Sequence, residues 1–138
     1  MSQIRVACVQ MRSGTAVADN IAAASALIRQ AAGQGAELIA TPEMTTLLDR
    51  KPGAVFEKST TEEADPGLAA FRALAAELQV TLLIGSIAIR AGDGKCANHS
   101  FLIGPDGEIV AWYDKIHMFD VQLNAGNIYR ESDSFAAG

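Results

Sequence analysis

Apolar and polar residues along the chain form blocks that predict strands and helices in alternation. Residues 4–10 (IRVACVQ) and 37–41 (ELIAT) are short runs rich in β-branched and apolar residues, which is typical of strands. Between them, apolar residues recur at helical spacing from Val17, and Gly33 and Gly35 mark the end of the helix that this spacing predicts. This part of the chain is therefore expected to form a strand, a helix and a second strand.

The middle of the chain predicts a second helix after an irregular segment. Residues 51–63 combine proline, glycine and mixed charges, and no regular element is expected there. Asp65 followed by Pro66 is a helix-start signal, because aspartate caps free backbone amides and proline fits the first helical position. The apolar residues of this helix fall on one face: Leu68, Phe71, Ala75 and Leu78.

Further strands are predicted after the second helix. Residues 80–84 (VTLLI) are apolar almost throughout, which favours a strand covered on both faces. Residues 98–104 and 108–113 flank the turn sequence PDG and are expected to pair as antiparallel strands. The order of elements indicates an α/β fold with a mixed sheet and helices on one face. Since no repeat or linker is present, residues 1–138 are expected to form a single domain.

Composition and charge restrict the kind of partner. With 49% hydrophobic and 20% charged residues, the 138-residue chain has the apolar content of one globular core. A formal net charge of -5, without a cluster of lysine or arginine, argues against nucleic acid or an anionic membrane as a partner. The N-terminus has no signal-peptide pattern and no apolar stretch is long enough to span a bilayer, so we expect a cytoplasmic protein that binds a small molecule.

Glu43 is a candidate general base. It follows the predicted strand 37–41 directly, where α/β folds place their active sites, and Pro42 stiffens the turn that presents it. Apolar neighbours such as Met44 are expected to raise its pKa by desolvation. The alternative is an ordinary solvated glutamate in a loop or at a helix start.

Lys115 follows the last predicted strand in the same way. An ammonium group packed between Trp112, Tyr113 and Phe119 could stabilise a developing oxyanion. The alternative is a surface lysine whose stem lies along the aromatic rings while its charge stays in water.

Other reactive residue types nearby have simpler interpretations. His117, between apolar residues, is either a general base or a hydrogen-bonded structural histidine. Asp114 and Asp120 are expected to cap or pair locally. Cys8 lies within an apolar strand and is expected to be inert core, whereas Cys96, beside a lysine in a predicted turn, is expected to be more exposed with a slightly lowered pKa. Neither cysteine has a partnered base or a metal-binding spacing.

Three motifs resemble a known family when they are taken together. TPEM follows a predicted strand, YDKIHMFDV follows the predicted hairpin, and YRESDSFAAG ends the chain. With VACVQM in the first strand, they are similar to the carbon-nitrogen hydrolase, or nitrilase, superfamily and to its small-amidase branch, over the whole chain. The resemblance implies a nitrilase-like α-β-β-α sandwich, of which this chain would form the N-terminal half.

The resemblance also implies a role for each candidate. Glu43 matches the general base of the family, and Lys115 matches the lysine that binds the tetrahedral intermediate. Glu131 matches a second glutamate that holds the lysine and the reacting group in place. In this interpretation the aromatic residues around Lys115 position it and partly remove it from water.

One part of the family's site is not found in the sequence. Members use a cysteine nucleophile on a strand-to-helix elbow beyond the second glutamate, and neither Cys8 nor Cys96 matches that motif. We therefore expect a truncated protein that is inactive alone, and an intact enzyme that releases ammonia from a small amide through a cysteine thioester. No metal or organic cofactor is implied, and the resemblance implies a homo-oligomer.

Two alternatives come from other classes of protein. The chain is either part of such an enzyme or a complete, non-catalytic module for binding or assembly, whose open sheet edge a partner would cover. A nucleotide-binding domain is disfavoured, because the loop MRSGTA after the first strand lacks both the G-x-G-x-x-G and the P-loop pattern.

Overall fold

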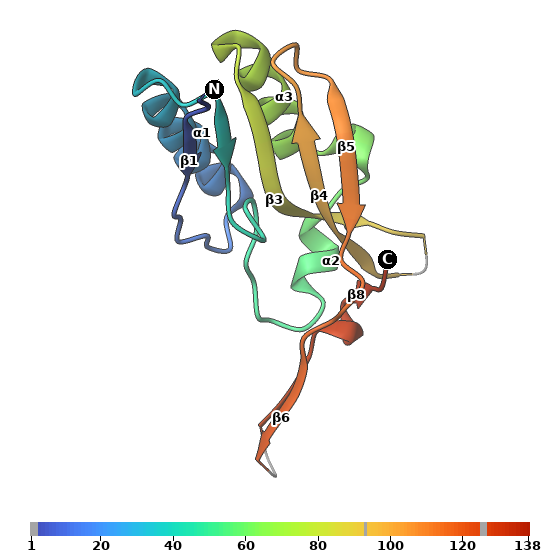
Figure 1. The fold of residues 1–138 in the computed structure, drawn as a ribbon. Coiled ribbons are helices and arrows are strands. Elements are labelled where there is room, and N and C mark those ends of the chain that lie inside the picture. The colour runs from blue at the N-terminus through green and yellow to red at the C-terminus, as the bar shows by residue number, and fades with distance from the viewer. Residues whose placement is uncertain (1–2, 93, 125–126) are drawn as a thin grey trace.

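The chain folds around a mixed β-sheet (Figure 1). The structure is a computed structural model that describes residues 3–92, 94–124 and 127–138. The strand order of the sheet is β1-β2-β3-β4-β5, and β8 pairs with β4. The first three strands are parallel, whereas β3, β4 and β5 are antiparallel. The strands are β1 (Val6–Cys8), β2 (Leu38–Ala40), β3 (Thr81–Arg90), β4 (Cys96–Ile103), β5 (Ile109–Asp114) and β8 (Phe135–Ala136).

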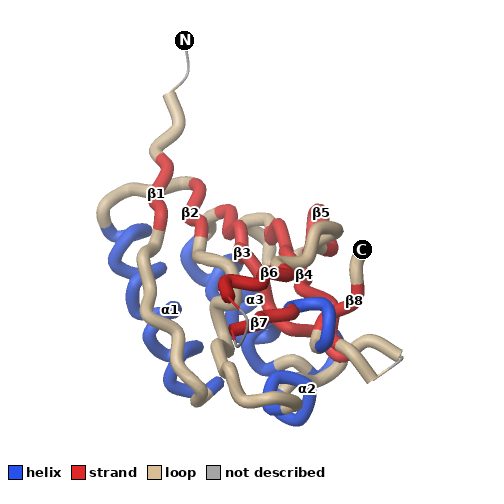
Figure 2. The backbone as a smooth tube through the Cα atoms, turned by 90° about the horizontal axis from the view of Figure 1, so that it is seen from below, coloured by secondary structure: helices blue, strands red, loops and turns tan. Residues whose placement is uncertain are grey.

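The two longer helices connect the parallel strands. Helix α1 (Val17–Gly33) runs between β1 and β2, and helix α3 (Pro66–Leu78) runs between β2 and β3. Both lie on the same side of the sheet (Figure 2) and bury Ile28 and Phe71 against it. The prediction of a mixed sheet with helices on one face is therefore confirmed. Among the described residues, no helix is long and apolar enough to cross a membrane.

The opposite face of the sheet is open over its first three strands. Leu83 of β3 is 39% exposed and Val6 of β1 is 52% exposed, because the described helices α1 and α3 cover only the other face. The expectation that residues 80–84 are covered on both faces is therefore wrong. Cys8 also lies exposed, so its prediction as core residue is wrong for the same reason.

Short helices occupy the segment that was expected to be irregular. Helix α2 (Ala54–Lys58) lies within it, and the 3-10 turn η1 (Glu62–Ala64) begins at its end. Val55 of α2 packs into a small second core that also contains Leu47, Ala88, Cys96 and Phe135. A five-residue helix is too short for hydrophobic periodicity to reveal it.

The C-terminal segment contains more regular structure than its polar sequence suggested. Strands β6 (Asp120–Asn124) and β7 (Asn127–Arg130) pair as a hairpin that projects from the sheet (Figure 1). The 3-10 turn η2 (Glu131–Asp133) follows, and Asp120 accepts hydrogen bonds from the backbone and hydroxyl of Ser132. Phe135 of β8 is buried beside β4, so this segment is anchored to the sheet.

The start of α3 offers a test of the predicted cap. Asp65 is buried and its Oδ1 accepts a hydrogen bond of 2.8 Å from the Leu68 amide. Burial raises the pKa of Asp65, and the hydrogen bonds from Leu68, Gly67 and Thr60 only partly oppose this effect. An asparagine would keep the acceptor without a buried charge.

We predict that Asp65→Ala lowers the free energy of unfolding by about 1 kcal/mol, because a free helix amide loses its acceptor. Asp65→Asn is expected to retain most of the stability at neutral pH. Urea denaturation of the three proteins measures both differences. An asparagine variant as unstable as the alanine variant would contradict the capping role.

Candidate active site

The turn after β2 presents Glu43 and is held by hydrogen bonds to β3. The Thr41 amide donates to the Leu83 carbonyl at 2.9 Å, and the Met44 amide donates to the Ser86 hydroxyl at 2.8 Å. Met44 has a φ of 52°, in the left-handed region that non-glycine residues rarely adopt. The turn is therefore fixed on both sides of Glu43.

Gly85 of β3 allows this turn to approach the sheet closely. A Cβ atom at Gly85 would lie 2.4 Å from the Thr41 carbonyl oxygen and 2.5 Å from the Pro42 carbonyl oxygen. The β3–β4 register shifts at the same place, between Ile84 and Ile87, as in a β-bulge. The absence of a side chain at Gly85 thus lets the chain that carries Glu43 cross β3.

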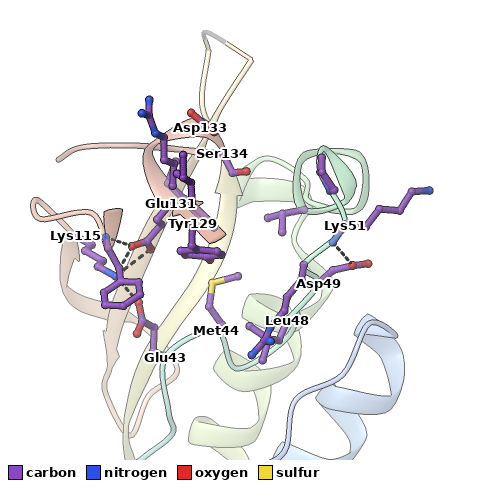
Figure 3. A pocket seen from close by; sticks show the side chains of 17 residues that line it. Glu43, Met44, Leu48, Asp49, Lys51, Lys115, Tyr129, Glu131, Asp133 and Ser134 are labelled. Carbon is purple, nitrogen blue, oxygen red and sulfur yellow. Dashed lines mark hydrogen bonds and ion pairs between the residues drawn. The ribbon is translucent and has the colours of Figure 1, made fainter. Parts of the chain in front are cut away.

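Lys115 meets both candidate glutamates (Figure 3). Its Nζ lies 3.0 Å from Glu43 Oε1, 3.0 Å from Glu131 Oε1 and 2.8 Å from Glu131 Oε2. Lys115 follows β5 directly, Glu43 follows β2 after a two-residue turn, and Glu131 begins η2. The structure thus brings the three predicted site residues into one cluster.

Glu131 is the buried member of this cluster. It is 7% exposed, and its Oε2 also accepts a hydrogen bond of 2.6 Å from the Phe119 amide. A buried carboxylate requires such donors, and Lys115 and Phe119 supply them. Glu131 therefore fixes the position of the lysine rather than facing solvent.

Asn98 of β4 belongs to the same network and was missed in the sequence. Its Nδ2 donates to Glu43 Oε1 at 2.8 Å and lies 3.3 Å from Glu131 Oε1. A single asparagine at the start of a predicted strand has no distinguishing pattern. Only the pairing of β4 with its neighbours shows that it faces the two glutamates.

Opposing effects set the pKa of Glu43. Burial pushes it up, but hydrogen bonds from Lys115 and Asn98, with the charge of Lys115, outweigh burial and leave the pKa below its ordinary value. Apolar neighbours were expected to raise it, and that expectation is wrong because the two donors dominate together. For Lys115, burial lowers the pKa, but Glu131 and Glu43 outweigh burial and raise it.

These shifts define the pH range in which the pair stabilises the protein. The contribution of Glu43 is present above the pKa of an unfolded glutamate and is lost as the pH falls through its lowered pKa. The contribution of Lys115 to stability is present below the pKa of an unfolded lysine and is lost as the pH rises through the raised pKa of Lys115 in the folded protein. Both groups are charged at neutral pH.

The expected aromatic surroundings of Lys115 are largely wrong. Trp112 is 65% exposed and stacks on His99 at 5.3 Å, and Tyr113 is 54% exposed. Of the three predicted rings, Phe119 alone lines the pocket beside Lys115. β-strand alternation sends the side chains of Trp112 and Tyr113 to opposite faces of the sheet, so the two rings do not enclose Lys115 together. Its ammonium is positioned by the carboxylates of Glu43 and Glu131.

The other titratable candidates lie outside the cluster. His117 is exposed in the loop between β5 and β6. Asp114 of β5 lies 2.8 Å from His99 Nδ1 of β4, and Asp120 of β6 holds Ser132, so the expectation of local capping or pairing is wrong: both pair with residues distant in the sequence.

The two cysteines have the reverse of their expected exposure. Cys96 is fully buried, and burial raises its pKa beyond what the Ser59 hydrogen bond and the charge of Arg90 offset. The prediction of an exposed thiol with a lowered pKa is thus wrong, because Cys96 lies within β4 and not in a turn. Cys8 is the exposed cysteine. Of the described residues that line the pocket, none is a cysteine.

A pocket of about 420 Å³ lies beside the cluster (Figure 3). Glu43, Lys115 and Glu131 form one wall of it. Apolar side chains from the turn after β2 and from the C-terminal hairpin contribute elsewhere, among them Met44, Leu48, Phe119, Ile128 and Tyr129. Among the described residues, no group of three or more histidine, cysteine or acidic side chains has the geometry to hold a metal ion.

This fold and cluster define an α/β domain in which a lysine lies between two glutamates at the wall of a pocket. Residues 5–138 match the family model for carbon-nitrogen hydrolases. The chain belongs to the carbon-nitrogen hydrolase family, and the predicted resemblance is confirmed.

Curated relatives of the chain include amidases. It is 34% identical over 140 residues to a deaminated glutathione amidase of Synechocystis, which covers 100% of this chain and 51% of the relative. It is 33% identical over 140 residues to an omega-amidase of Danio rerio, covering 100% of this chain and 49% of the relative. The chain thus spans about half the length of these relatives, which fits a resemblance to half of the family's fold.

Solved structures show the same fold. The NitFhit protein of C. elegans superposes with a TM-score of 0.85 at 23% identity, covering 96% of this chain and 32% of that one. The NitN amidase of Nesterenkonia sp. AN1 gives a TM-score of 0.81 at 21% identity, covering 99% of this chain and 50% of that one. At these identities the likeness establishes the fold.

We predict that Lys115→Met raises the pKa of Glu43, because the variant loses a hydrogen bond and a positive charge while burial remains. Carboxyl-detected NMR titration of the chain measures this pKa. Arg29→Met is the matched control, since Arg29 pairs with Glu77 on the helical side of the molecule. A Glu43 pKa that is the same in both variants would contradict the network.

We also predict that Gly85→Ala lowers the free energy of unfolding by about 1 to 3 kcal/mol, because the added methyl group meets rigid backbone of the Glu43 turn. Gly92→Ala is the control, since a Cβ there has no atom within 4 Å. It should change stability by no more than about 0.5 kcal/mol. Urea midpoints compare the two, and equal effects would show that close packing at Gly85 is unimportant.

Proposed function

We propose that this chain supplies the base, the oxyanion-binding lysine and the supporting glutamate of an enzyme that hydrolyses small amides and releases ammonia. The observation that carries the proposal is the contact of 3.0 Å between Glu43 and Lys115 at the wall of the pocket. Membership of the carbon-nitrogen hydrolase family and the amidase names of the relatives support it.

Glu43 acts as the proton acceptor. Its lowered pKa keeps it ionised at neutral pH, and its side chain is 57% exposed toward solvent and the pocket. It takes the proton of a thiol, and the thiolate attacks the amide carbonyl. The oxyanion that forms accepts a hydrogen bond from Lys115, whose ammonium is already held in place by Glu131.

The intermediate then collapses. The carbon-nitrogen bond breaks, Glu43 returns its proton to the leaving nitrogen, and ammonia departs from a thioester. Glu43 next takes a proton from a water molecule that attacks the thioester. The carbon-sulfur bond breaks and the acid departs, and Glu43 returns the proton to the sulfur, which restores both the thiol and the carboxylate. No metal or organic cofactor takes part in this sequence.

The nucleophile comes from a segment outside residues 1–138. Cys8 and Cys96 do not line the pocket, and Cys96 is fully buried. A structure of the Nesterenkonia amidase records Michael addition of acrylamide at its active site cysteine, which supports a cysteine nucleophile in this family. The 138-residue chain alone is therefore inactive.

The substrate is a small amide, with an ω-amide of a dicarboxylic acid as the first choice. The name of the Danio rerio omega-amidase supports an ω-amide, and the name of the Synechocystis deaminated glutathione amidase supports an amide substrate. A pocket of about 420 Å³ suits a small ligand, and its apolar side chains would contact the carbon chain of the substrate.

The test compares the natural gene product that contains these residues with the 138-residue chain, by ammonia release from ω-amides. We predict turnover by the gene product and none by the chain. Glu43→Gln and Lys115→Met are each expected to lower kcat/KM of the gene product by at least about 10³-fold. Arg29→Met, which removes a surface partner of Glu77 on the helical side of the molecule, should leave kcat/KM unchanged within about twofold.

Two results would contradict the proposal. Ammonia release by the chain alone would show that a cysteine beyond residue 138 is unnecessary. An inactive, folded gene product would instead favour the module for binding or assembly, whose partner would cover exposed residues such as Val6 and Leu83.

A further inference from the structure

Asn98 lies at the centre of the cluster without lining the pocket. It is 2% exposed, and its side chain reaches Glu43 and Glu131. Its backbone carbonyl accepts a hydrogen bond of 3.0 Å from the Lys115 amide. One buried residue of β4 therefore contacts all three charged members of the site.

The two glutamates differ in how their oxygens are used. Glu131 accepts hydrogen bonds at both oxygens, from Lys115 at each, from Asn98 at Oε1 and from Phe119 at Oε2. Both hydrogen bonds that described residues donate to Glu43, from Lys115 and Asn98, reach Oε1. Oε2 of Glu43 is thus the oxygen that can accept a hydrogen bond or a proton from a ligand in the pocket.

A carboxamide suits this position chemically. It donates to a carboxylate without adding a charge and without a proton that titrates near neutral pH. An aspartate at the same place would face two carboxylates, and a lysine would compete with Lys115. An amide can orient Glu43 while leaving proton transfer to the glutamate itself.

We propose that Asn98 is a positioning residue of the site, which turns Oε1 of Glu43 toward Lys115 and leaves Oε2 as the proton-accepting oxygen. The assignment of Glu43 as the base rests on the proposed function. The orientation of the Glu43 carboxylate by Asn98 does not rest on the proposed function, and this orientation can be tested without measuring turnover.

The first experiment therefore uses the 138-residue chain and leaves Asn98 unchanged. The Asn98 side-chain amide protons, followed by NMR across acidic pH, are expected to shift in step with the ionisation of Glu43. The part of this titration that follows Glu43 should disappear in Glu43→Gln. The Asn20 amide is the internal control, since Asn20 is also buried but donates to the backbone of Gly14 and Thr46. Asn98 protons insensitive to Glu43 would overturn the proposal.

The second experiment measures the pH profile of the gene product with Asn98→Leu, which keeps similar volume without donors. We expect kcat/KM to fall by about 10- to 100-fold, the cost of a hydrogen bond to a charged group, while KM changes less than about twofold. Loss of a donor raises the pKa of Glu43, so the acid limb of the profile moves to higher pH.

Asn20→Leu separates positioning from stability, because it also removes a buried amide, but one that donates to the backbone of Gly14 and Thr46 and not to either glutamate. It should lower the melting temperature without moving the acid limb. An acid limb that stays in place in Asn98→Leu would overturn the positioning role. An inactive gene product would refute the proposed function, whereas the NMR titration would still decide the contact between Asn98 and Glu43.

Discussion

The ammonium of Lys115 between two carboxylates is the interaction on which this site depends. It joins Glu43, 72 residues earlier in the chain, to Glu131, 16 residues later. A partly buried ammonium needs several acceptors, and the two glutamates supply three oxygens within 3.0 Å. Removing Lys115 would leave two carboxylates close together, so the charges of the cluster are interdependent.

The sheet provides the geometry for this interaction. Strand β2 delivers Glu43 at its carboxyl end, and the β4–β5 hairpin returns the chain so that Lys115 leaves β5 beside Asn98. The turn after β2 must cross β3 to reach them, which Gly85 permits because it has no side chain. The segment after Lys115 then brings Glu131 back, and burial of Phe135 beside β4 fixes it there.

The sequence predicted the parts of this arrangement that depend on local order. Strand ends identified Glu43 and Lys115, and the Asp65 cap and the hairpin were found from short patterns. Glu131 was found only through the family resemblance, since nothing local marks it. Asn98 was missed because its role depends on contacts with Glu43 and Glu131, which lie 55 and 33 residues away. The exposure of Cys8 was predicted wrongly because it depends on which face of the sheet is covered, and that of Cys96 because it depends on where β4 begins. The direction of the Glu43 pKa shift was predicted wrongly because two donors distant in the sequence outweigh burial.

The most direct test of the central claim, that this cluster serves covalent amide hydrolysis, is the intact mass of the gene product quenched in acid during turnover of an ω-amide. We predict an adduct with the mass of the substrate less ammonia, attached to a cysteine other than Cys8 and Cys96. Ammonia release from a protein whose mass never changes, under conditions that trap thioesters, would contradict a thioester mechanism at the Glu43–Lys115 site.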